Sequence, residues 1–142
     1  MFLLLLGVSC FLMVKGAMKV GDREFGPVCS RYLAKLEAHD YAGAYALIAE
    51  EGQRAFPEEK HNKIMKGMSD KLGPVESKEV QFVQTGFDQS GKWGRIVYAT
   101  KFRNGPGTIR FELRKTTGEY RIVGVFFQSP LLNDLVNEAL SK

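Results

Sequence analysis

The sequence predicts an α+β domain, with N-terminal helices packed on a curved antiparallel sheet of about four strands and a short C-terminal helix. Apolar residues recur every three to four positions before Gly73-Pro74 and alternate with polar residues after it. Turn sequences rich in glycine then divide the second half into pieces of strand length. The length of 142 residues suits one core, so we expect a single domain over residues 27–142.

The N-terminal segment differs from the rest of the chain. Residues 1–14 are almost wholly apolar and are fewer than the roughly 20 residues that cross a bilayer as a helix. They match the apolar part of a secretory signal, although no Lys or Arg precedes them. We predict a signal peptide or membrane anchor over residues 1–16, followed by a linker over 17–26. Cleavage before Ala17, lipidation of Cys10 and a buried helix of the fold are the open alternatives.

Three helices are predicted between Pro27 and Gly73. Pro27 suits the first turn of a helix, where its missing N–H costs nothing. Asp40 can cap the second helix by accepting free backbone N–H groups, and residues 50–52 are expected to end it. Pro57 with two following glutamates opens the third helix, which stops at Gly73-Pro74.

Four strands follow, separated by turns at residues 88–91, 104–107 and 116–119. Two of them carry clear alternating apolar faces, which we expect to point at the helices: Ile96, Tyr98, Thr100 and Phe102, then Ile109, Phe111 and Leu113. Residues 131–140 have helical apolar spacing and are expected to form the short C-terminal helix. A strongly curved sheet of this kind leaves a cavity between itself and the helices.

Three short stretches carry a family resemblance: EAHDYAGAY over residues 37–45, LGPVES over 72–77 and GEYRIVG over 118–124. They resemble the helix–helix turn, the step into the first long strand and the closing strand of nuclear transport factor 2-like (cystatin-like) domains. The resemblance covers roughly residues 27–128 and is closest to small secreted bacterial proteins or lipoproteins of unknown function. It implies that the first aromatic of the turn, Tyr41, packs the helices on a curved sheet.

The sequence offers little catalytic chemistry. The acid/base constellations of enzymes in this superfamily do not map onto it, and we predict no catalytic residue, no metal site and no cofactor. His39 and His61 are the two histidines, and both are expected to be solvated. Cys29 is expected to be a small buried apolar residue. The formal net charge of +4 is mild and dispersed, so a nucleic-acid partner is not favoured.

Aromatic residues are the candidates for a binding site. If a cavity exists, a buried tyrosine needs a hydrogen-bond partner, so tyrosines would supply its polar points. The predicted cavity residues are Tyr45, Tyr98, Phe82, Phe102 and Phe111. Positive charge for the outer surface of the sheet is expected from Arg95, Lys101, Arg103, Arg110, Arg114 and Arg121.

These features favour a non-catalytic domain, exported (periplasmic or extracellular) or membrane-anchored, that binds a small apolar ligand or a protein partner. One alternative is a cavity enzyme of the isomerase or dehydratase type, which requires a histidine or carboxylate buried in the cavity. The other is a structural domain that forms a homodimer through its sheet. Contact with a membrane would be made by the N-terminal segment if it is retained or acylated.

Overall fold

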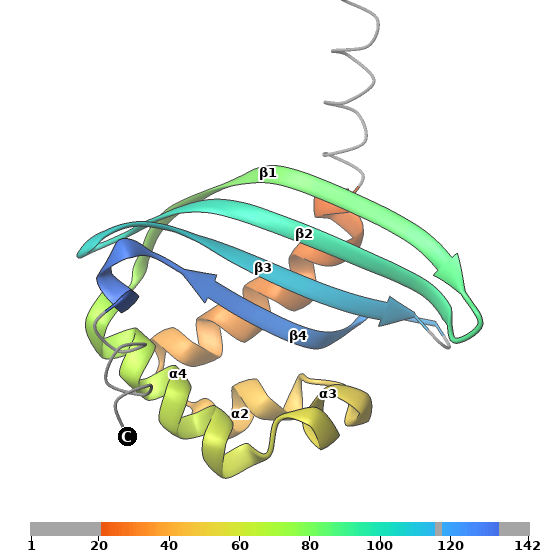
Figure 1. Ribbon diagram of the computed structural model, residues 1–142, viewed down its shortest axis with the longest axis horizontal. Coiled ribbons are helices and arrows are strands. Elements are labelled where there is room, and N and C mark those ends of the chain that lie inside the picture. Colours follow the sequence, from red (N-terminus) through yellow and green to blue (C-terminus); the bar gives the residue numbers. More distant parts are fainter. Residues whose placement is uncertain (1–20, 116–117, 134–142) are drawn as a thin grey trace, which may run out of the picture.

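The computed structural model describes residues 21–115 and 118–133, in which a layer of helices packs under a curved four-stranded sheet (Figure 1). All neighbouring strands are antiparallel, and their order in the sheet follows the sequence. The predicted α+β fold class is therefore confirmed. Within the described residues, no helix has the length and apolarity needed to cross a membrane.

The first helix extends further toward the N-terminus than predicted. Residues 21–37 are helical, so residues 21–26 are helix where the sequence was expected to form a linker, and Pro27 lies inside the helix. Phe25, Cys29 and Tyr32 are fully buried, and the Phe25 ring meets the edge of Tyr120 at a centroid distance of 4.7 Å. Their spacing of four and three residues places all three on one helical face, so the apolar stripe begins at Phe25, before Pro27.

The helices that follow are α2 (Tyr41–Ala46), α3 (Glu50–Ala55) and α4 (Glu58–Leu72). Asp40 caps α2 as predicted, because its Oδ1 accepts the Gly43 N–H at 2.9 Å. Residues 50–52, expected to end a helix, instead begin α3. The backbone is extended at Ala49, whose N–H donates to the Ile122 carbonyl at 2.7 Å, so the sheet interrupts the helical path there.

Helix α4 ends where the sequence predicts. Gly73 has a φ of 73°, a left-handed value that favours glycine, and its N–H donates to the Ser69 carbonyl at 3.0 Å. The Asn104 side chain donates to the Lys71 carbonyl at 2.9 Å, so the turn between the second and third strands completes the cap.

The strands are β1 (Val75–Asp88), β2 (Gly91–Phe102), β3 (Gly105–Lys115) and β4 (Arg121–Gln128), followed by the 3-10 turn η1 (Pro130–Leu132). The predicted inward faces of β2 and β3 are buried, which confirms their alternation. Most of the predicted C-terminal helix, and all of the signal or anchor segment, lie outside the described residues.

A register shift in β1 changes the faces of that strand. It falls between Val80, which pairs with Tyr98, and Phe82, which pairs with Val97. Val80 therefore faces the helices while Phe82 faces outward, where 45% of its surface is exposed. Strict alternation cannot predict this placement, because an extra residue inverts every side chain after it.

Candidate functional site

The centre of the concave face is filled with side chains. Tyr98 is 1% exposed, its hydroxyl donates to Asp22 Oδ1 at 3.1 Å, and its ring packs edge-on against the fully buried Phe111 at 6.1 Å. Tyr32 packs on the other side of Phe111 at 6.0 Å. Two of the predicted cavity residues, Tyr98 and Phe111, are thus core residues.

The other three predicted cavity residues are dispersed. Phe82 lies on the outer face of the sheet, for the reason given above. The Tyr45 hydroxyl donates to the Gln53 carbonyl at 3.1 Å, which links α2 to α3. Phe102 alone among the five lines a cavity. Two cavities lie along the two sides of α4, away from the centre of the sheet.

The larger of these spaces has a volume of about 420 Å³ and lies between α3, α4 and β4. We call it the His61 cavity. Its wall is mostly apolar, with Ile64 at 39% exposure among its lining residues. The lining residues are Tyr32, Ile48, Gly52, Ala55, Phe56, His61, Ile64, Met65, Met68, Val123, Gly124, Val125, Phe126 and Phe127.

The polar groups of this cavity are a hydrogen-bonded pair, Tyr32 and His61. The Tyr32 hydroxyl lies 2.8 Å from His61 Nε2, and His61 Nδ1 lies 2.8 Å from Asn62 Oδ1. Because an amide oxygen only accepts, Nδ1 carries the proton and Nε2 accepts from the Tyr32 hydroxyl. His61 is 0% exposed, so the expectation that it is solvated is wrong.

His61 is neutral in this environment. Burial lowers the pKa of its imidazole below the ordinary 6.5, and this outweighs the opposing effects of the Asn62 hydrogen bond and the Glu58 charge. Burial also raises the pKa of the Tyr32 hydroxyl well above 10. Both groups therefore stay uncharged near neutral pH, as an apolar cavity requires.

The sequence contained one overlooked signal for His61. It lies four residues before Met65 on the predicted helix, which places both on the same face. Lys60 and Lys63, its charged neighbours along the chain, suggested exposure, but they point to other faces of α4 and are exposed. Its partner Tyr32 is 29 residues away in sequence and belongs to another helix, so only the fold brings the two together. His39, by contrast, is exposed as predicted.

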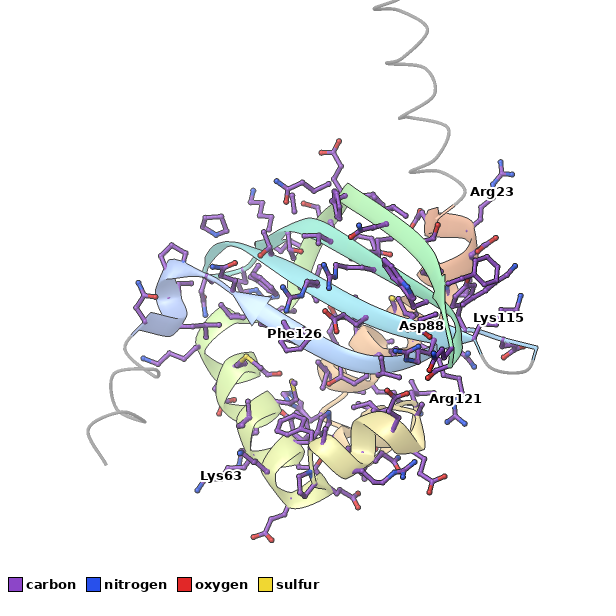
Figure 2. The ribbon with its side chains drawn as sticks, turned by 45° about the vertical axis from the view of Figure 1, so that its right-hand side comes forward. Arg23, Lys63, Asp88, Lys115, Arg121 and Phe126 are labelled. Carbon is purple, nitrogen blue, oxygen red and sulfur yellow. The ribbon has the colours of Figure 1, made fainter. Side chains whose placement is uncertain are left out.

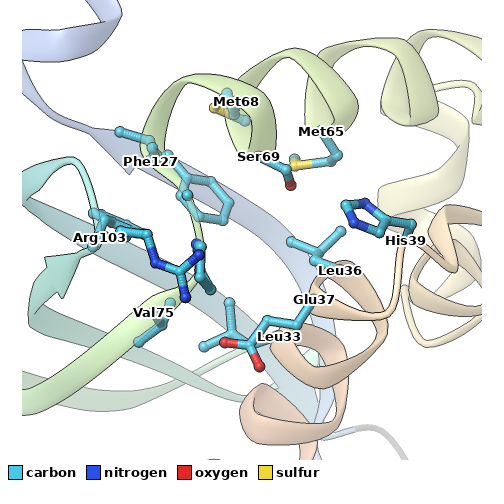
Figure 3. Close-up of a pocket in the computed structure, with 14 residues that line it drawn as sticks. Leu33, Leu36, Glu37, His39, Met65, Met68, Ser69, Val75, Arg103 and Phe127 are labelled. Carbon is cyan, nitrogen blue, oxygen red and sulfur yellow. The ribbon is translucent and has the colours of Figure 1, made fainter.

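A second cavity of about 240 Å³ lies on the other side of α4, against the first helix and the start of β1 (Figure 3). We call it the Arg103 cavity. Leu33, Leu36, Leu72, Val75 and Phe102 supply apolar wall. Arg103, Glu37 and His39 also line this cavity and are exposed, which places them at its rim, and Figure 3 shows Arg103 on the side of the sheet and Glu37 and His39 on the side of the first helix. Arg103, predicted to charge the outer sheet surface, is thus found at a cavity mouth.

The two cavities share a wall. Met65 and Met68 of α4 and Phe127 of β4 line both spaces. Met65 is buried and the other two are half-buried. Methionine has three rotatable bonds and fills irregular gaps, so this wall can be rearranged at low cost.

The outer face of the sheet carries a different chemistry. Arg95 and Arg110 reach Glu112 at 3.1 and 3.7 Å, and Arg114 reaches Asp88 at 2.9 Å. The Arg110 guanidinium lies 4.3 Å from the centre of the Phe126 ring, which is 46% exposed on β4 (Figure 2). Much of the predicted positive charge is therefore paired within the sheet.

Neither a metal-type cluster nor a reactive cysteine is found in the described part of the chain. No three His, Cys, Asp or Glu side chains among those residues converge as a metal site would require. Cys29 is buried as predicted, and burial raises the pKa of its thiol to about 12, so it stays protonated and unreactive.

Comparison with known proteins shows a shared fold. No family model matches the sequence, and no curated protein matches it. Among solved structures, Aln2 from a Streptomyces species is similar over 82% of this chain and 93% of its own, with 13% identity and a TM-score of 0.52. A variant of Rv3472 from Mycobacterium tuberculosis, a protein of unknown function, is similar over 89% and 90%, with 13% identity and a TM-score of 0.53. At this identity the likeness shows a shared fold alone.

Proposed function

We propose that this protein is a binding domain for a small apolar ligand that carries one hydrogen-bonding group. The observation that carries the proposal is the His61 cavity, whose apolar wall holds a single buried polar pair. Its volume of about 420 Å³ falls in the range of roughly 300–1,000 Å³ that is usual for ligand pockets.

The polar pair defines the ligand chemistry. The Tyr32 hydroxyl donates a hydrogen bond to His61 Nε2, and its oxygen keeps lone pairs that can accept a hydrogen bond from a ligand. A ligand with a hydroxyl donor and an apolar body would satisfy this oxygen without burying a charge. A charged ligand group would lose its hydration with no opposite charge from the pair, because both residues are neutral.

Titration with 1-naphthol, followed by its fluorescence, tests the proposal. We expect saturable binding to the wild type and a loss of at least tenfold in affinity for Ile64→Trp, since the indole would fill the cavity at a half-exposed position. The matched control is Lys63→Trp, on the same helix but outside the cavity lining. Equal binding by both variants, or none by the wild type, would reject the proposal.

A second candidate is proton transfer of the isomerase or dehydratase type, and His61 favours it. An enzyme was expected to need a buried histidine or carboxylate in its cavity, and His61 meets that requirement with a lowered pKa. Once a ligand displaces the hydrogen bond between the two residues, His61 Nε2 would take a proton from the carbon beside a ligand carbonyl, and the freed Tyr32 hydroxyl would donate to the developing enolate oxygen.

Hydrogen–deuterium exchange at the α-carbon of 2-tetralone, measured by NMR in D₂O, separates the two candidates. Catalysis predicts faster exchange with the wild type and a loss of that acceleration in His61→Gln, while the exposed His39→Gln retains it. Binding of naphthol without any acceleration of exchange would leave the non-catalytic function standing.

We further propose that the chain is exported or membrane-anchored and belongs to the nuclear transport factor 2-like superfamily. The apolar residues 1–14 support the first, and the three sequence motifs together with the shared fold of Aln2 and Rv3472 support the second. Intact mass of the expressed protein would show a chain from Ala17, a lipid-modified Cys10 or the full chain. Recovery of the full chain in the cytoplasmic fraction would reject export. An alignment of this chain with members of the superfamily in which Asp40, Tyr41 and Gly73 have no counterparts would reject the family.

A further inference from the structure

We infer that the two cavities form one binding site for an unbranched aliphatic amphiphile with a neutral, dipolar head group such as a primary amide. The inference rests on the proposed binding of an apolar ligand and names its class, with the one hydrogen-bonding group of the ligand at the mouth of the Arg103 cavity instead of at Tyr32. The chain of the ligand would lie in the His61 cavity and pass beneath α4, and its head would lie at the mouth of the Arg103 cavity.

The wall that the two spaces share is the first argument. Met65, Met68 and Phe127 line both cavities, and methionine is the side chain that most readily adopts another rotamer to let a longer ligand pass. The Arg103 cavity, at about 240 Å³, is small for a ligand pocket on its own. As an extension of the larger cavity it accommodates the end of a longer molecule.

The distribution of polar groups is the second argument. In the Arg103 cavity the deep wall is aliphatic and aromatic, while Glu37, His39 and Arg103 stand at the opening (Figure 3). This order, apolar within and polar at the rim, matches an amphiphile whose head remains near water. A compact ligand would leave one of the two apolar spaces unfilled.

The charges at the mouth determine the head group. Arg103 and Glu37 have opposite signs, and neither forms an ion pair with any residue in the described ranges. An amide presents a carbonyl that accepts from Arg103 and an N–H that donates to Glu37. A carboxylate head would meet repulsion from Glu37, and an amine head would meet repulsion from Arg103.

The test measures binding of decanamide, decanoate and decylamine by calorimetry. Decanamide should bind the wild type most tightly. Arg103→Gln should weaken it roughly tenfold, in line with the loss of one hydrogen bond to a charged group. Glu37→Gln removes the charge that repels a carboxylate head group, so it should improve decanoate binding. Arg103→Gln removes the charge that repels an amine head group, so it should improve decylamine binding. Lys63→Gln, an exposed change on α4, should alter none of the three.

Sensitivity at both ends identifies one ligand that spans both cavities. Ile64 lines only the His61 cavity and Arg103 lines only the other. Decanamide should therefore lose affinity in both Ile64→Trp and Arg103→Gln, whereas 1-naphthol should respond only to Ile64→Trp. If 1-naphthol loses affinity only in Ile64→Trp, and the affinity of decanamide is unchanged in Arg103→Gln, the extended site is wrong and the proposed function stands. If neither probe binds the wild type, both are wrong.

Discussion

At the scale of single residues, the hydrogen bond between Tyr32 and His61 distinguishes this interior from an ordinary apolar core. Both side chains are fully buried, so the Tyr32 hydroxyl and His61 Nε2 depend on each other for a hydrogen-bond partner. Tyr98 offers a natural comparison, because its hydroxyl donates to Asp22, which is exposed and can be rehydrated. The same loss of a phenol oxygen should therefore have different costs at the two positions.

We predict that Tyr32→Phe lowers the free energy of unfolding by about 1–3 kcal/mol, because it leaves His61 Nε2 buried without a donor. Tyr98→Phe should cost less, about 0.5–1.5 kcal/mol, the usual net value of one hydrogen bond. Urea denaturation of both variants measures the difference. A smaller loss for Tyr32→Phe than for Tyr98→Phe would contradict the assigned hydrogen bond.

The lowered pKa of His61 predicts a pH dependence of stability. Between the folded pKa and the unfolded value of 6.5, the unfolded chain binds more protons, so stability rises with pH across that window. The contribution of neutral His61 to the free energy of unfolding should be fully present above pH 6.5. On acidification this one group should lower the free energy of unfolding by at most about 1.4 kcal/mol per pH unit.

The measurement compares urea denaturation at pH 7 and pH 5. The His61→Gln variant should lose less stability on acidification than the wild type. His39→Asn is the control, because His39 is exposed and its φ of 58° is one that asparagine tolerates. A wild-type slope reproduced by His61→Gln would show that another group is responsible.

At the scale of elements, α4 forms part of the wall of both cavities. The residues that fix its ends therefore affect both. Its C-terminal cap, Gly73, lines the Arg103 cavity and has a Cβ position 3.0 Å from Arg103 Cβ. Gly67, near the middle of the same helix, has open space within 4 Å of its Cβ position. The backbone conformation therefore requires glycine at position 73 but not at position 67.

We predict that Gly73→Ala destabilises the protein by about 1–2 kcal/mol, since a left-handed conformation is unfavourable for a residue with a Cβ. Gly67→Ala should stabilise it by about 0.5–1 kcal/mol through higher helix propensity. Thermal denaturation of the pair checks both signs. Equal effects would show that the conformation at residue 73 is not required.

At the scale of the whole molecule, the outer face of the sheet is the surface most suited to a second copy of this chain. Phe82 and Phe126 are each nearly half exposed there, at 45% and 46%, on the two outermost strands. Arg110 and Glu112 alternate on β3 between them, so a two-fold axis could set each against its opposite charge in the other copy.

We therefore expect a dimer in solution that Phe126→Glu converts to a monomer, measured by light scattering over a range of concentrations. Phe87→Glu is the control, because Phe87 is 75% exposed but lies near the β1–β2 turn. A monomeric mass for the wild type at all concentrations would reject this pairing.

Hydrophobic periodicity determined the fold class and the inward faces of β2 and β3, and residue type determined the cap at Asp40 and the stop at Gly73. These are local features, since each depends on dihedral preference and on which side chains share a face. Tertiary structure decided the start of the first helix, the bulge that turns Phe82 outward and the burial of His61. It also decided that the cavities lie beside α4 and not at the centre of the sheet. Such features depend on how side chains distant in sequence fill a common volume, and no local pattern contains that information.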